Sequence, residues 1–74
     1  MKLPLLSSKE ICTFLEKEGF KCIRQKGSHC FYRHPDGRTT IVPAHSNKDI
    51  KRNLLKAILG EIRMTREEFF SRFK

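Results

Sequence analysis

The sequence of 74 residues predicts an α+β fold in which helices cover one face of a three-stranded antiparallel sheet. Apolar residues recur at helical spacing in two separate stretches, 8–18 and 50–59. Between these stretches lie three short runs with strand character, which turn-forming residues separate from one another. We therefore expect the order helix, three strands, helix, with a short extra helix near the C-terminal end.

The first helix is expected to begin at Ser7. Ser7 and Glu10 have the spacing of a capping box, in which the Ser7 hydroxyl accepts from the Glu10 backbone N–H and the Glu10 carboxylate accepts from the Ser7 N–H. The apolar stripe that follows consists of Ile11, Phe14 and Leu15. Gly19 is expected to end the helix in a left-handed conformation. The helix is interpreted as a core-packing element.

The three expected strands are residues 20–25, 29–34 and 39–43. Lys26-Gly27-Ser28 and Pro35-Asp36-Gly37 supply the turns between them, because glycine accepts positive backbone angles and proline presets its own. Strict alternation puts Phe20, Cys22 and Arg24 on one face of the first strand. In the second strand it puts His29, Phe31 and Arg33 on one face and Cys30, Tyr32 and His34 on the other. Alternation does not decide which face is buried.

The second main helix is predicted from an apolar stripe that begins at Ile50. The stripe consists of Ile50, Leu54, Leu55, Ile58 and Leu59, and the polar face of Lys48, Lys51, Arg52 and Lys56. Thr65 and Glu68 then repeat the capping-box spacing. A short last helix with three phenylalanines, Phe69, Phe70 and Phe73, is therefore expected.

Length and composition limit the class of protein. A chain of 74 residues makes one domain, 1–74, and 38% hydrophobic with 32% charged residues is typical of a globular rather than a disordered chain. No window approaches the roughly 18 apolar residues of a membrane span. Polar residues directly follow the apolar run at 3–6, so no signal peptide is expected. The odd number of cysteines, three, agrees with a reducing compartment, and we expect a cytoplasmic protein.

Positive charge is concentrated in the middle of the chain. The 16 Lys and Arg against 8 Asp and Glu give a net charge of +8. Residues 20–56 carry nine basic and two acidic side chains, net +7, whereas residues 1–19 are neutral. This excess indicates an anionic partner: nucleic acid, an anionic membrane surface or an acidic protein.

The first hairpin combines this charge with a histidine. Arg24, Lys26, Arg33 and, past the next turn, Arg38 are expected to lie around His29, and phosphate is their natural ligand. A histidine titrates near neutral pH, so His29 can take a proton from a ribose 2′-hydroxyl or give one to a leaving 5′-oxygen. Cationic neighbours would stabilise the charge on the phosphorane. A structural or merely solvent-exposed histidine remains the alternative.

Zinc binding and a cysteine nucleophile are the two alternative chemistries. The zinc-compatible side chains are Cys22, His29, Cys30, His34 and His45. They contain no Cys-x-x-Cys pair, and neighbours on a strand diverge, which disfavours zinc. The same divergence disfavours Cys30 as a nucleophile with His29 or His34 as its base. His45 is either a second polar contact near the site or a loop histidine in water.

With these features in order, the chain resembles the HicA family of toxins. The matching segments are 2–5, 8–10, 15–20, Gly27-Ser28-His29, 32–37, 42–45, 55–59 and 67–69. Gly-Ser-His alone is a weak signal, but the ordered set along the chain is specific. Where the family has glycines before and after the second main helix, this chain has Asn53 and Arg63. This departure puts the end of that helix in question.

The resemblance implies a double-stranded-RNA-binding-domain-like fold and endoribonuclease activity on mRNA that needs neither metal nor cofactor. It puts the catalytic histidine at His29 and implies neutralisation by a HicB-like antitoxin that covers the site. No membrane partner is expected, and DNA would be contacted only through the antitoxin, if at all. In this hypothesis Arg24, Lys26 and Arg33 bind phosphate, while Gly27 and Ser28 let the backbone approach RNA.

Two hypotheses from other classes stay open. A non-catalytic double-stranded-RNA-binding module would carry a lysine cluster at the N-terminus of its last main helix, and Lys48, Lys51 and Arg52 loosely imitate one. A protein-interaction domain would use the basic face to bind an acidic partner.

Overall fold

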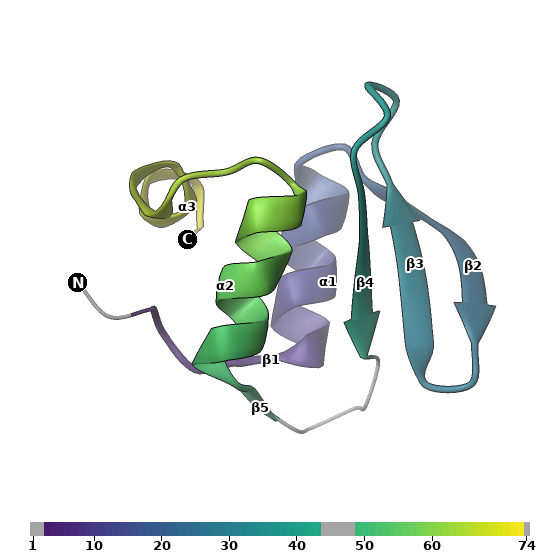
Figure 1. Ribbon diagram of the computed structural model, residues 1–74, viewed down its shortest axis with the longest axis horizontal. Coiled ribbons are helices and arrows are strands. Elements are labelled where there is room, and N and C mark those ends of the chain that lie inside the picture. The colour runs from purple at the N-terminus through teal and green to yellow at the C-terminus, as the bar shows by residue number, and fades with distance from the viewer. Residues whose placement is uncertain (1–2, 44–48, 74) are drawn as a thin grey trace.

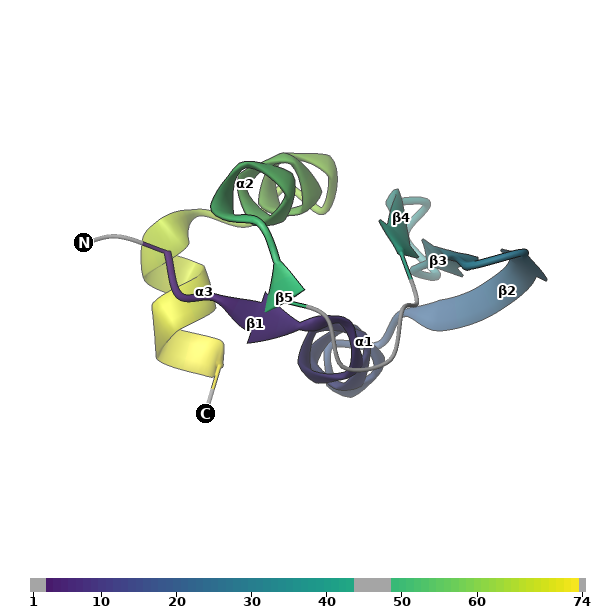
Figure 2. The ribbon, with the colours of Figure 1, turned by 90° about the horizontal axis from the view of Figure 1, so that it is seen from below.

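The computed structural model describes residues 3–43 and 49–73, and its layers are those of an α+β fold (Figures 1 and 2). The main elements are helix α1 (Ser8–Lys17), strands β2 (Lys21–Lys26), β3 (His29–Arg33) and β4 (Thr39–Pro43), and helices α2 (Arg52–Glu61) and α3 (Arg66–Arg72). Strands β2, β3 and β4 form an antiparallel sheet in that order. The predicted order of elements is therefore confirmed. No helix among the described residues has both the length and the apolar character needed to cross a membrane.

One face of this sheet is packed against α1 and α2. Cys30, Tyr32 and Val42 point to this side, and each is at least nine-tenths buried. Thr40 is buried beside them, and its hydroxyl donates to Glu61 of α2 over 2.6 Å. The inner face that alternation left undecided is thus the face of Cys30 and Tyr32.

Helix α1 begins and ends as the sequence predicts. Both hydrogen bonds of the capping box are present: Glu10 N–H to Ser7 Oγ at 3.1 Å and Ser7 N–H to Glu10 Oε1 at 3.0 Å. Gly19 follows at φ +99, and the Phe20 N–H donates back to the Leu15 carbonyl over 2.9 Å. These bonds satisfy carbonyls that the last turn leaves without helical partners.

The predicted start of the second main helix is wrong. Ile50 belongs to strand β5 (Asp49–Ile50), which pairs with strand β1 (Leu6–Ser7). The buried Ile50 lies opposite Leu6, also buried, so its apolar side chain serves this two-stranded pair rather than the helical stripe. Helix α2 begins only after Lys51, its N-cap residue.

The end of α2 explains the departure at position 63. Arg63 is the only non-glycine with a positive φ, +56, among the described residues. Its N–H donates to the Gly60 carbonyl and the Met64 N–H to the Leu59 carbonyl, at 3.2 and 3.0 Å. This is a Schellman ending, in which glycine is the preferred residue at the position of Arg63. The helix therefore ends in the expected conformation without the glycine.

Helix α3 has the second predicted capping box, formed by Thr65 and Glu68. Its Phe69 is fully buried, and the Phe69 ring lies 5.3 Å from that of Phe14. Arg72 donates to Glu18, the C-cap residue of α1, over 2.7 Å. Helix α3 thus closes the core on the side of α1 and α2 away from the sheet (Figure 1).

Candidate active site

A β-bulge in β2 determines which side chains lie beside His29. Cys22 pairs with Tyr32, but the next pair is Arg24 with Phe31, so Ile23 is the extra residue of the bulge. Residues directly opposite each other share a face. Cys22 therefore faces inward and Arg24 outward, and the prediction that they share a face is wrong. A bulge shifts the alternation by one residue.

The shift gathers basic residues on the side of the sheet away from the helices. We call this side the outer face; the described residues on it are Lys21, Arg24, Lys26, His29, Phe31, Arg33, Thr39, Ile41 and Pro43. None of these residues is acidic. The side chains of its four Lys and Arg make no hydrogen bond or ion pair with any other residue that the structure describes. The outer face thus carries unneutralised positive charge.

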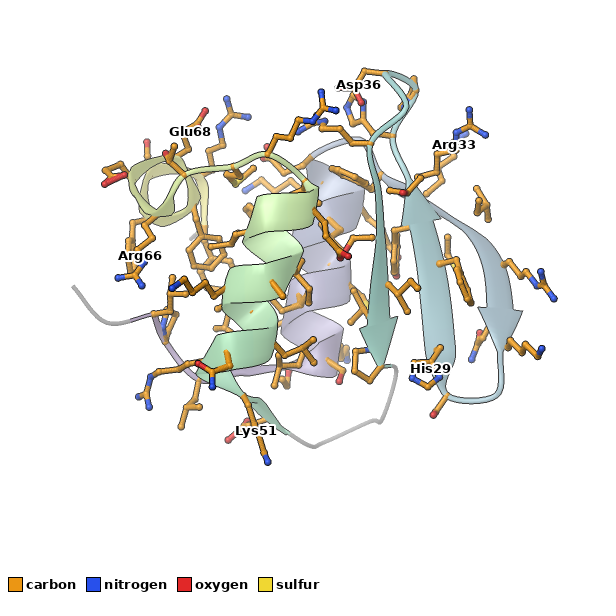
Figure 3. The ribbon with its side chains drawn as sticks, viewed as in Figure 1. His29, Arg33, Asp36, Lys51, Arg66 and Glu68 are labelled. Atoms are coloured by element: carbon orange, nitrogen blue, oxygen red, sulfur yellow. The ribbon has the colours of Figure 1, made fainter. Side chains whose placement is uncertain are left out.

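His29 lies at the start of β3, at the hairpin end of the outer face (Figure 3). Its register partners are Lys26 on β2 and Pro43 on β4. The loop between Lys26 and His29 is only Gly27 and Ser28, and Gly27 has φ +59, as at the first central position of a type II′ turn. The imidazole is exposed and has no hydrogen-bond partner within the described part of the chain. Both of its ring nitrogens are therefore available to a ligand.

The hairpin brings four of the predicted site residues next to His29, but not all of them. Lys26, Gly27 and Ser28 adjoin it, and Arg24 lies two residues along β2 on the same face. Arg33 lies at the other end of β3, about 13 Å away for four residues of strand (Figure 3). Arg33 can therefore contact only a ligand that extends along the sheet.

The expectation that Arg38 adds charge beside His29 is wrong. Arg38 lies in the turn between β3 and β4, at the opposite end of the sheet. Its guanidinium donates to Asp36 over 2.8 Å and to the Ile62 carbonyl over 2.6 Å, and it lies 5.2 Å from the centre of the Phe20 ring. The predicted charge of Arg38 is thus used to hold this turn to the end of α2.

His34 belongs to the same tied turn. Its Nδ1 accepts from the Asp36 backbone N–H over 3.1 Å, and its ring packs edge-on against Phe20 with centres 5.1 Å apart. The side chain is about three-quarters buried. His34 is therefore a structural histidine, and it is remote from His29.

The geometry contradicts a cysteine nucleophile. Cys30 points to the inner face, whereas its neighbour His29 points outward. Burial raises the pKa of the Cys30 thiol and likewise that of Cys12, so both stay in the unreactive thiol form at neutral pH. No group of three or more His, Cys, Asp or Glu side chains in residues 3–43 and 49–73 is arranged to hold a metal ion. The candidate ligand His45 lies outside the described residues.

The lysine cluster of a double-stranded-RNA-binding module is only partly available. Lys48 is outside the described residues, and Arg52 donates its Nε–H to the Leu3 carbonyl over 2.7 Å. Lys51 is exposed at the N-cap of α2, on the same edge of the molecule as His29 (Figure 3). The first turn of α2 contains no acidic residue, so its positive dipole end adds to the potential at this edge.

Sequence reasoning missed Lys21 as a member of this site. Lys21 pairs with Arg33 and extends the outer face at its far end. Lys21 lies in the same strand as Arg24, but strict alternation along β2 would put the two side chains on opposite faces of the sheet. Only the bulge brings the two onto one face.

Comparison with known families gives the class: residues 8–64 match the model of the HicA toxin of bacterial toxin–antitoxin systems. The match spans more than half of the chain, which therefore belongs to the HicA toxin family. The arrangement of α1, α2 and the three-stranded sheet is consistent with the double-stranded-RNA-binding-domain-like fold of that family. No curated protein matches the chain.

Proposed function

We propose that this HicA-family toxin is a metal-independent endoribonuclease that cleaves mRNA, with His29 as general acid or base. The observation that carries the proposal is the position of His29, a side chain able to exchange protons near neutral pH, among cationic side chains. His29 is an exposed imidazole without a hydrogen-bond partner among the described residues, on a sheet face whose described charged side chains are all cationic. A polyanion held along this face would bring a phosphodiester to a group able to move protons at neutral pH.

The reaction that fits is attack of a ribose 2′-oxygen on the adjacent phosphorus. His29 takes the 2′-hydroxyl proton, the new O2′–P bond forms as the P–O5′ bond breaks, and the leaving 5′-oxygen takes a proton from water. The products are a 2′,3′-cyclic phosphate and a 5′-hydroxyl. Arg24 and Lys26 stabilise the added charge on the phosphorane, and Arg33 binds a phosphate farther along the strand. Gly27, which has no side chain, and the short Ser28 let RNA approach the backbone closely.

The toxin–antitoxin family implies an antitoxin partner. We propose a HicB-like protein that puts acidic groups over the outer face, since opposite charges would meet there. Any contact with DNA would be made through that antitoxin, and the toxin would act in the cytoplasm on mRNA.

A non-catalytic double-stranded-RNA-binding module is the second candidate. It is less well supported because Arg52 is engaged with the Leu3 carbonyl, and of the described cluster only the Lys51 side chain has no hydrogen-bond partner among the described residues. Such a module also leaves the exposed His29 without a role.

The test is cleavage of an unstructured mRNA in EDTA by the wild type, His29→Ala and His34→Ala. We expect His29→Ala to lose at least 100-fold in rate, a typical contribution of general acid–base catalysis. His34→Ala is the matched control, and it should cleave at close to the wild-type rate under conditions where it is folded. Normal cleavage by His29→Ala would contradict the mechanism. If no variant cleaves but all bind RNA with strong salt dependence, the binding module is the better account.

A further inference from the structure

Phe31 occupies an unusual position for a phenylalanine in this molecule. All six phenylalanines lie in the described residues. Phe14, Phe20 and Phe69 belong to the core, and Phe70 and Phe73 pack against it. Phe31 does neither, and its ring contacts no other aromatic ring. It lies in the middle of the outer face, half-buried, with no described element covering it.

The residues around Phe31 form an apolar centre with a cationic border. Ile41 lies directly opposite Phe31 on β4 and is 42% exposed. Arg24 lies opposite on β2, while His29 and Arg33 are two residues away on each side along β3. Core packing does not explain an aromatic and aliphatic pair on the face away from the helices. The described outer face has no acidic residue, so its cationic border suits an anionic partner, and the ring of Phe31 suits a flat apolar group.

A nucleotide of single-stranded RNA meets both requirements. We propose that Phe31 is the stacking platform for an unpaired base next to the phosphodiester that His29 cleaves. The proposal rests on the ribonuclease function proposed above and identifies its substrate as unpaired RNA. Two residues of strand separate Phe31 from His29, about 7 Å. This distance suits one nucleotide step of an extended strand, with its base on the ring and its phosphate at the histidine.

The proposal distinguishes single strands from duplexes. A base inside a duplex is stacked on its neighbours and cannot reach a ring on a flat sheet, whereas every unpaired base offers a π-face. Arg24 makes no cation–π contact with Phe31 and remains available to a phosphate beside the stacked base. We therefore expect preference for single strands with little dependence on sequence at the stacked position.

A tryptophan reporter tests stacking directly, because the chain contains no tryptophan of its own. The probe is a short 2′-O-methyl RNA, which lacks the attacking hydroxyl and cannot be cleaved. Its binding is followed independently by anisotropy of a label on the RNA. Phe31→Trp fluorescence should be quenched with the same midpoint as the anisotropy change. Leu5→Trp is the control, since Leu5 is 51% exposed and lies before α1, outside the sheet; its fluorescence should not change.

RNA binding that leaves the Phe31→Trp fluorescence unchanged would overturn the stacking proposal. So would equal affinity for the single strand and for the same strand annealed to its complement. If only the antitoxin of the toxin's own system changes the signal, the apolar centre is a protein contact and the proposal is wrong.

Cleavage by three further variants separates stacking from the catalytic proposal. Phe31→Leu keeps the bulk and should lose about tenfold or more in kcat/KM, whereas Phe31→Tyr keeps the ring and should lose far less than Phe31→Leu. Phe31→Ala should lose at least as much as Phe31→Leu. If Phe31→Leu cleaves like the wild type while His29→Ala is inactive, stacking fails and the ribonuclease proposal stands. If the wild type does not cleave, the ribonuclease proposal fails, and the fluorescence test still decides whether Phe31 binds bases.

Discussion

The two ends of the three-stranded sheet each carry a turn with a glycine at positive φ and a histidine, yet they are built differently. At the end with Gly37 and His34, side-chain hydrogen bonds tie the turn to itself and to the end of α2. At the end with Gly27 and His29, the His29 side chain makes no such bond within the described residues. Residue type alone therefore does not separate a structural histidine from a candidate catalytic one, but the hydrogen-bond partners do.

The basic side chains divide in the same way. Arg38, Arg52 and Arg72 each donate to an oxygen of another element or turn. The side chains of the Lys and Arg on the outer face donate to no described residue. Charge that stabilises the fold and charge available to a ligand are thus found on different parts of the molecule.

Replacement of glycine by alanine should cost more stability at Gly19, beside the turn that contains His34, than at Gly27 in the other turn. Gly19 has φ +99, and a Cβ there would lie 3.0 Å from His34 Nε2. Gly19→Ala combines this contact with the strain of a positive φ, so we expect a loss of about 2–3 kcal/mol in the free energy of unfolding. Gly27 has φ +59, but a Cβ there meets nothing within 4 Å, so Gly27→Ala should lose only about 1 kcal/mol. Urea denaturation measures both.

A double-mutant cycle sharpens that result. If the contact with the His34 ring contributes, Gly19→Ala should cost less in a His34→Ala background. Equal losses at Gly19 and Gly27 would contradict the described packing.

Exchange of arginine for glutamine should act in opposite ways at the two ends. Arg38→Gln loses the bond to the Ile62 carbonyl and the contact with Phe20, so we expect about 1–3 kcal/mol less stability and unchanged RNA affinity per folded molecule. Arg24→Gln should leave the melting temperature unchanged and weaken RNA binding several-fold. It should also reduce the slope of log affinity against log salt by about 0.7 if Arg24 contacts one phosphate. If the two substitutions changed stability and RNA affinity equally, the division into a structural Arg38 and an RNA-binding Arg24 would be wrong.

Arg63→Gly should stabilise the protein by about 1 kcal/mol. Arg63 holds a left-handed conformation, φ +56, that glycine adopts without strain. Arg63→Ala is the control for the lost charge, and it should give little or no gain because alanine shares the strain. Thermal unfolding measures both, and cleavage should be unaffected. A gain with alanine equal to that with glycine would assign the effect to charge rather than to the backbone.

The smallest predicted effect is a dependence of stability on pH that originates at Asp36. Hydrogen bonds from the Arg38 backbone N–H and guanidinium lower the pKa of the Asp36 carboxyl. A pKa that is lower in the folded state gives stability above the ordinary aspartate range, and this stability is lost as pH falls through the folded-state value. Asp36→Asn should therefore flatten the acid limb of melting temperature against pH between about 5 and 2. Parallel curves for wild type and variant would contradict this.

Local sequence signals predict the parts of the fold that local chemistry determines. The two capping boxes at Ser7 and Thr65, the left-handed Gly19 and the two turns of the sheet depend on residues close together in the chain, and all are confirmed. Strands β1 and β5 were not predicted because each has two residues and the pair joins distant positions: Leu6 and Ile50 are 44 residues apart, and Ser7 and Asp49 are 42 apart. Two residues carry no measurable alternation.

The site was predictable only in part for the same reason. The hairpin from Lys26 to His29 is local and could be recognised from its turn residues and charge. The bulge at Ile23, which brings Lys21 and Arg24 onto one face, depends on pairing with β3. The structural use of Arg38 depends on Ile62, 24 residues away. Charge along a sequence therefore overestimates the number of side chains that a ligand can reach.

The measurement that tests the central claim most directly is the paired loss of His29 and His34, each read for both stability and cleavage. Removing the His34 side chain takes away its packing on Phe20 and the acceptor for the Asp36 N–H. We predict that His34→Ala loses about 1–2 kcal/mol in the free energy of unfolding and cleaves RNA normally while folded. His29→Ala should unfold like the wild type and lose at least 100-fold in cleavage rate. The reverse pattern, or two variants that lose stability and cleavage together, would contradict the assignment of the two histidines.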